Sequence, residues 1–92
     1  MKITAVFQGI MSDWIGMEQA DFDLREGAVL ADLLAEIFNA FREKSPEQLW
    51  NHEHGAFARP VRAFTAESPI NDTGAPLTEG QEVIFCLMLA GG

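Results

Sequence analysis

Few residues in this sequence are of a type and spacing that could carry chemistry. The candidates are the terminal pair Gly91-Gly92, the single cysteine Cys86, and the pair His52 and His54. A terminal carboxylate becomes an acyl donor once it is activated, and glycines without a Cβ can pass through a channel too narrow for side chains. We therefore expect the reactive group to be the carboxylate of Gly92 rather than a side chain.

The cysteine and the histidines favour less reactive interpretations. Cys86 lies in an apolar run, where a lone cysteine is more often a small hydrophobic residue than a reactive thiol. His52 and His54 have no further ligands at metal-site spacing, so we interpret them as part of a polar loop and expect no metal site. The sequence also lacks a set of nucleophile, base and orienting residue and a glycine-rich phosphate loop, so we expect a protein that is not an enzyme.

Length and composition limit the class of protein further. The chain has 92 residues, of which 48% are hydrophobic, a content typical of a globular domain and too high for a disordered chain. We therefore expect a single domain over residues 1–92. The net charge of −8 disfavours nucleic acid and anionic membrane surfaces as partners. This charge either keeps a small protein soluble or steers it to a basic partner.

Targeting signals are not evident in the sequence. No apolar run approaches the roughly 20 residues of a membrane helix, and the apolar stretch at the start is too short for a signal peptide. A single cysteine rules out a disulfide within this sequence and fits a reducing compartment. We expect a cytoplasmic protein that does not bind membranes.

Alternating apolar residues predict two strands near the start of the chain. The alternating residues are Ile3, Ala5 and Phe7 in the first segment and Ala20, Phe22 and Leu24 in the second. A period of two is typical of half-buried strands, and an antiparallel hairpin is the simplest way to pair them. Residues 9–16 are predicted to form a turn, with Trp14 and Ile15 folded back on the core.

After Gly27 the period changes to about 3.6, which predicts a long helix. Its apolar face consists of Val29, Leu30, Leu33, Leu34, Ile37, Phe38 and Phe41. The start lacks a Ser, Thr, Asp or Asn cap, although Asp32 stands in the first turns, where the helix dipole favours negative charge. A second, short helix is predicted from Ser45-Pro46-Glu47-Gln48 through Trp50.

The last third of the chain predicts two further strands. Residues 52–59 are expected to form a loop or irregular edge, residues 61–66 a strand, and residues 68–74 a turn. The nearly continuous apolar run 82–87 predicts a strand in the middle of the sheet. Val83, Phe85 and Leu87 are expected to face the helix. Ile84, Cys86 and Met88 are expected on the other face, as either a second buried layer or a docking patch.

This order of elements predicts the α+β class and a ubiquitin-like β-grasp, in which one long helix packs across a mixed sheet. Three stretches of the sequence, together with the opening strand, resemble the ThiS/MoaD family of sulfur carriers, and most closely the small subunit of molybdopterin synthase. They are residues 24–34, with the sequence LREGAVLADLL, residues 75–83, with APLTEGQEV, and residues 89–92, with LAGG.

The resemblance implies a carrier whose last residue is modified by a partner. An E1-like adenylating enzyme would activate the Gly92 carboxylate with ATP, and sulfur transfer would leave a thiocarboxylate. In molybdopterin (molybdenum cofactor) biosynthesis, a larger MoaE-like synthase subunit then receives the tail. The carrier would bind no cofactor itself, and residues 89–92 would form an exposed tail. We assign partner binding to Ile84, Cys86, Met88, Leu89, Ala90 and Gly91.

Other functions stay open on the sequence alone. The sulfur could serve thiamine, tungstopterin or cysteine synthesis, or the activated end could be attached to other proteins through an isopeptide bond. A different class is a non-conjugating β-grasp module that binds proteins and never activates its end.

Overall fold

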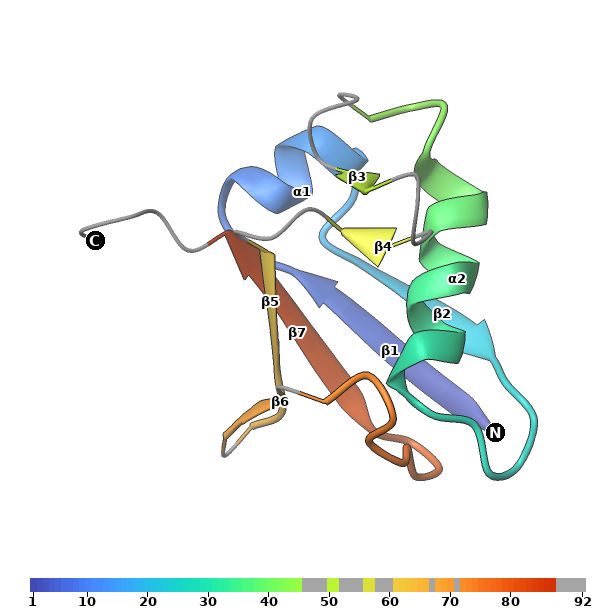
Figure 1. Ribbon diagram of the computed structural model, residues 1–92. Coiled ribbons are helices and arrows are strands. Elements are labelled where there is room, and N and C mark those ends of the chain that lie inside the picture. Colours follow the sequence, from blue (N-terminus) through green and yellow to red (C-terminus); the bar gives the residue numbers. More distant parts are fainter. Residues whose placement is uncertain (46–49, 52–55, 58–60, 67, 71, 88–92) are drawn as a thin grey trace.

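The computed structural model describes residues 1–45, 50–51, 56–57, 61–66, 68–70 and 72–87 (Figure 1). The strands are β1 (Lys2–Phe7), β2 (Gln19–Asp23), β3 (Trp50–Asn51), β4 (Ala56–Phe57), β5 (Val61–Phe64), β6 (Pro69–Ile70) and β7 (Glu82–Leu87), and the helices are α1 (Ile10–Ile15) and α2 (Leu30–Phe41). Five strands form one sheet in the order β2-β1-β7-β5-β6, and β3 pairs with β4 separately.

The sheet is mixed, and α2 packs across one of its faces (Figure 1). β1 pairs with β2 in antiparallel orientation, as the predicted hairpin requires. β7 lies at the centre, parallel to β1 and antiparallel to β5. The predicted α+β class, the β-grasp arrangement and the central position of the last strand are confirmed.

The core lies between the sheet and α2. Ile3 and Ala5 of β1 are fully buried, as are Leu33 and Ile37 of α2. They occupy the positions that the periods of two and 3.6 predicted, because each period places apolar side chains on one face of its element. Among the described residues, no helix is both long and apolar enough to cross a membrane.

The start of α2 is capped by a distant loop. The amide of Leu30 donates to the carbonyl of Ala75 over 2.9 Å, and that of Ala31 donates to Thr73 over 2.8 Å. Asp32 Oδ2 accepts from the amide of Val29 at 2.9 Å. These acceptors satisfy amides that have no partner within a helix, which explains how α2 begins without a Ser or Thr cap.

The turn predicted for residues 9–16 is wrong, because Ile10–Ile15 form the short helix α1. Met11 and Ile15 are spaced one helical turn apart, and both are buried on the core. The helix ends at Gly16, whose φ of 93° is left-handed and favours glycine. Trp14 packs against the core as predicted.

The helix predicted through Trp50 is also wrong at that residue, which lies in β3. The Trp50 ring stacks on Phe57 of β4 at a centroid distance of 4.7 Å and meets the Phe38 ring edge-on at 5.5 Å. This aromatic packing fixes an extended conformation that local sequence signals do not reveal. The rest of that predicted helix, residues 46–49, and the predicted loop at 52–55 and 58–60 lie outside the described residues.

Ser45 contacts the end of α2, and the 68–74 segment differs from the prediction. The Ser45 hydroxyl donates to the Phe41 carbonyl over 2.8 Å, so it satisfies an acceptor at the end of α2. Within the predicted turn, Pro69–Ile70 form β6, which pairs with β5. Proline is tolerated there because β6 is an edge strand.

A charged contact on β1 and β2 should make stability depend on pH. The Thr4 hydroxyl donates to Asp21 Oδ1 over 2.7 Å, and Lys2 Nζ lies 3.4 Å from Oδ2. The Thr4 hydrogen bond, and to a lesser extent Lys2, hold the pKa of Asp21 below its usual value of 3.8. The ionised carboxylate therefore contributes stability above pH 3.8, and the contribution is lost as the pH falls through the lower folded-state pKa.

We therefore expect Asp21→Asn to be less stable than the parent protein near neutral pH. Urea unfolding at a series of pH values measures this difference, which should shrink as the pH falls below 3.8. A difference that stays constant into acid would contradict the assignment.

Candidate functional site

The two faces of β7 differ as the sequence predicts. Val83 and Phe85 are buried on the helix side, at 0% and 1% exposure. Leu87 is partly buried and packs against the same core. Ile84 and Cys86 alternate with them and are half-buried on the opposite face. We call that opposite face of the sheet the outer face.

Three apolar side chains form a row across the outer face. Ile84 is paired with Val6 of β1 on one side and with Phe64 of β5 on the other. Directly paired residues of neighbouring strands share a face, so these three side chains are neighbours. All three are half-buried. We call Val6, Ile84 and Phe64 the outer apolar row.

Polar and charged residues border this row. Cys86, also half-buried, is paired with the exposed Arg62 of β5. On the other side, Thr4 is paired with Asp21 and with Glu82. An apolar centre with a charged border is typical of a protein-docking surface, and the partial exposure argues against a second buried layer.

The end of β7 carries a second apolar area. The amide of Gln8 donates to the Phe85 carbonyl over 3.0 Å, which holds the end of β7 beside the start of α1 (Figure 1). Ile10 at the start of α1 and Met17 after it are 45% and 43% exposed. Large apolar side chains with this exposure are suited to contact a partner at the end of the sheet from which residues 88–92 continue.

Five of the seven residues assigned to the site from sequence lie outside the described residues. They are Met88, Leu89, Ala90, Gly91 and Gly92. The two that the structure describes, Ile84 and Cys86, do lie on one face of one strand. Their assignment to partner binding, and that of Gly92 to the chemistry, remain predictions.

Sequence reasoning missed four residues of this surface. Val6 and Phe64 join Ile84 only through the register of three strands, which no local pattern specifies. Ile10 and Met17 lay in or beside a segment that we expected to be a turn. The available signal was the alternation in segments 2–8 and 61–66, which would have placed Val6 and Phe64 on non-core faces.

Metal chemistry finds no support in the part of the chain that the structure describes. No group of three or more His, Cys, Asp or Glu side chains is placed there to hold a metal ion. His52 and His54 lie outside that part. The described geometry is an apolar row with a charged border on the outer face of the central strand.

Comparisons with known proteins support the fold. No protein-family model matches the sequence, and no curated protein matches it.

Solved structures do match. SAMP1 from Haloferax volcanii is 13% identical with a TM-score of 0.79, and the match covers 100% of both chains. A putative molybdopterin converting factor, subunit 1, from Pyrococcus furiosus is 16% identical with a TM-score of 0.73, covering 97% of this chain and 99% of the other. Urm1 from Trypanosoma brucei is 16% identical with a TM-score of 0.72, covering 99% of this chain and 95% of the other. The chain therefore has the ubiquitin-like β-grasp fold, and its predicted resemblance to ThiS/MoaD-like proteins is confirmed at the level of the fold.

Proposed function

We propose that this protein is a ubiquitin-like sulfur carrier and that the carboxylate of Gly92 is the group that carries the sulfur. The observation that carries this proposal is the position of β7, which is the central strand and the last of the described elements. β7 ends at Leu87, five residues before Gly92. Because β7 is hydrogen-bonded to β1 on one side and β5 on the other, its end holds a fixed position from which the remaining residues of the chain start.

The proposed chemistry takes place at the terminal carboxylate in two steps. An oxygen of the Gly92 carboxylate attacks the α-phosphorus of ATP, and pyrophosphate leaves. Hydrosulfide, or an equivalent sulfur donor, then attacks the acyl carbon, and AMP leaves to give the thiocarboxylate. Adenylation supplies the leaving group that a carboxylate lacks, so an E1-like partner provides the catalysis and this protein provides the substrate group.

The length of the chain after β7 and the apolar surface of the sheet are consistent with these roles of the partner enzyme and this protein. Five residues extend at most about 17 Å, enough to enter an active site enclosed within a partner. The outer apolar row crosses the middle of β7 at Ile84, and the exposed Ile10 and Met17 lie near the end of β7. We propose that these residues hold the E1-like enzyme and, in turn, a larger MoaE-like subunit while the tail reaches each active site.

We further propose that the sulfur enters molybdopterin biosynthesis. The support is the sequence resemblance together with the match over nearly the whole chain to a putative molybdopterin converting factor, subunit 1. Thiamine, tungstopterin and cysteine synthesis use the same carrier chemistry and differ in the acceptor. We place the reaction in the cytoplasm, because the reaction consumes ATP and the single cysteine of the protein suits a reducing compartment.

Intact-protein mass spectrometry tests the proposal. After incubation with the cognate E1-like enzyme, ATP and sulfide, we expect the mass gain that corresponds to replacement of one oxygen by sulfur. Omitting ATP should prevent the gain. An unchanged mass, under conditions that convert a known carrier with the same enzyme, would favour the non-conjugating binding module.

A second candidate function uses the same activated end. The matched structures include one described as small archaeal modifier protein 1 from H. volcanii, with a TM-score of 0.78. In that function the ε-amine of a lysine on another protein attacks the acyl adenylate, AMP leaves, and an isopeptide bond forms. Lysine-containing cross-linked peptides that end in Gly92 would distinguish attachment from sulfur transfer.

A further inference from the structure

The edge of the sheet formed by β2 has unpaired backbone groups. β2 is the first strand in the sheet order and, among the strands that the structure describes, pairs only with β1. Met1 and Leu24 exchange both of their backbone hydrogen bonds, at 2.7 and 2.8 Å. Bonding alternates along an antiparallel pair, so the N–H and C=O groups of Gln19, Asp21 and Asp23 point away from β1. This edge is therefore a template for one more strand.

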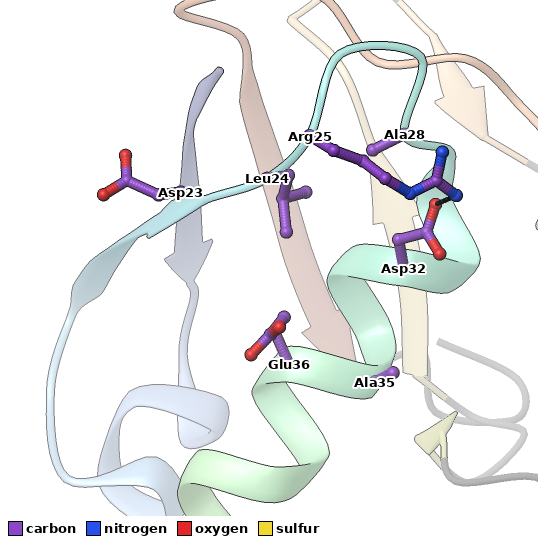
Figure 2. A pocket seen from close by; sticks show the side chains of 7 residues that line it. All are labelled: Asp23, Leu24, Arg25, Ala28, Asp32, Ala35 and Glu36. Atoms are coloured by element: carbon purple, nitrogen blue, oxygen red, sulfur yellow. Dashed lines mark hydrogen bonds and ion pairs between the residues drawn. The ribbon is translucent and has the colours of Figure 1, made fainter.

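A hollow lies beside this edge, between the end of β2 and α2 (Figure 2). Its volume is about 260 Å³, and Leu24, Ala28 and Ala35 supply its apolar lining. Leu24 and Ala28 are buried, so the floor is part of the core. The volume is below the roughly 300 to 1,000 Å³ of sites that enclose a whole small molecule. The hollow is suited to receive one long side chain of a larger ligand.

The charge around the hollow is negative. Asp32 and Glu36 contribute carboxylates, the carboxylate of Asp23 lies beside the hollow and points away from it (Figure 2), and Arg25 is the one cation among the described residues that line it. Arg25 Nη2 lies 3.3 Å from Asp32 Oδ2, so that cation already has a partner (Figure 2). Among the described residues, no cation lies within ion-pair distance of Asp23 or Glu36. A ligand that brings positive charge would complement both.

We propose that the β2 edge and the adjacent hollow bind an extended basic segment of a partner protein. The segment pairs with the outward backbone groups of β2 over about 17 Å, the length of five strand residues. Side chains on one face of the added strand lie toward the hollow, where a lysine or arginine meets Glu36 above the apolar floor. Those on the other face lie toward Asp21 and Asp23.

The acidic side chains of β2 favour a basic segment over a second copy of the chain as the ligand of this edge. Two β2 edges brought together would place the carboxylates of Asp21 and Asp23 against those of the other copy, and like charges across paired strands are destabilising. A basic strand reverses the sign of that interaction. The net charge of −8 favours its approach at low ionic strength.

This surface is separate from the one proposed for sulfur transfer. Asp23 is paired with Lys2 at the start of β1, whereas Phe85 of β7 is paired with Phe7 at the end of β1. The end of β2 that borders the hollow therefore lies at the opposite end of the sheet from the end of β7 (Figure 1). A basic segment and a partner that engages the tail can bind together.

Titration with synthetic peptides tests the proposal. The probe is the acetylated, amidated peptide Lys-Arg-Val-Arg-Lys, which has basic side chains on both faces of an extended strand, and the comparison peptide carries Glu in place of each basic residue. We expect the basic peptide, followed by amide NMR shifts at low salt, to perturb β2 and the first two turns of α2. We expect Glu36→Gln and Asp23→Asn each to weaken binding about two- to fivefold, the size of an exposed ion pair. Asp13→Asn on α1 removes the same charge away from the hollow and should leave affinity unchanged.

A backbone variant separates strand pairing from simple charge attraction. Asp21→Pro removes an outward N–H without removing a bond to β1, and Asp21→Asn is its matched control because it loses the same charge and keeps that N–H. We expect a further loss of at least about tenfold in Asp21→Pro, with its fold checked by the same spectra. Any of three results would overturn the proposal. The two peptides could bind equally well, Asp13→Asn and Glu36→Gln could lose the same affinity, or the NMR shifts could spread over all acidic surfaces. Deleting Gly92 should leave peptide binding unchanged.

Discussion

Deletion of Gly92 should reduce the rate of thiocarboxylate formation by about a hundredfold or more, because displacement of a reacting group by even about 1 Å can cost that much. The deletion leaves a carboxylate on Gly91 but withdraws it by one residue, about 3.5 Å of chain. The carboxylate of Gly91 then falls short of the position at which the partner enzyme adenylates it. Single-turnover conversion, followed by intact mass, measures the effect.

The same deletion should barely affect the fold. A single residue at a chain terminus contributes little to stability in most proteins, so we expect the free energy of unfolding to change by less than about 0.5 kcal/mol. Glu26→Gln is a control, since it changes an exposed residue outside the proposed partner-binding set, keeps Gly92 and should retain most of the rate. Full conversion of the shortened protein would show that thiocarboxylate formation does not require Gly92.

Phe85→Ala should destabilise the protein by about 3 to 5 kcal/mol, the usual result of truncating a buried aromatic residue. Phe85 is 1% exposed on the central strand. Its ring lies 6.1 Å from that of Phe7 and 5.2 Å from that of Phe57, so truncation leaves a cavity between two aromatic neighbours. The loss is large against the roughly 5 to 14 kcal/mol expected in total for this length. Urea unfolding of both proteins measures it.

Ile84→Ala provides the matched control for Phe85→Ala. Ile84 is the preceding residue of the same strand, but its half-buried side chain lies in the outer apolar row. We expect it to cost about 1 kcal/mol of stability and to weaken docking of the E1-like enzyme more than Phe85→Ala does in the folded protein. Equal stability losses in the two variants would contradict the assignment of the faces of β7.

The proposed carrier function and the proposed basic-segment site make different demands on the molecule. Sulfur transfer depends on Gly92 and on the surface at the end of β7, whereas peptide binding depends on Asp23, Glu36 and the open backbone of β2. Variants of one set should therefore leave the other activity intact, because the two sets lie at opposite ends of the sheet. Each proposal can fail without the other.

Several elements follow from the sequence by itself. β1, β2 and α2 each carry a clear period and β7 is a nearly continuous apolar run, and the structure places these elements where the patterns predict. The charge and the glycine pair Gly91-Gly92 are also properties of the sequence alone: the charge disfavoured nucleic acid as a partner, and the glycine pair led us to predict chemistry at the terminal carboxylate. Periodicity works here because each element buries one face on a common core, which is a local property of ten or so residues.

Other features were decided only by contacts between distant residues. Trp50 is extended because Phe57 and Phe38 pack on it, and α2 begins at Leu30 because the carbonyls of Thr73 and Ala75 accept its first amides. The outer apolar row exists only through the register of β1, β7 and β5, and the hollow beside β2 only through the approach of α2. A local pattern gives the face on which a side chain lies, but register and packing partners are set by the energy of the whole core, so only the tertiary structure determines them.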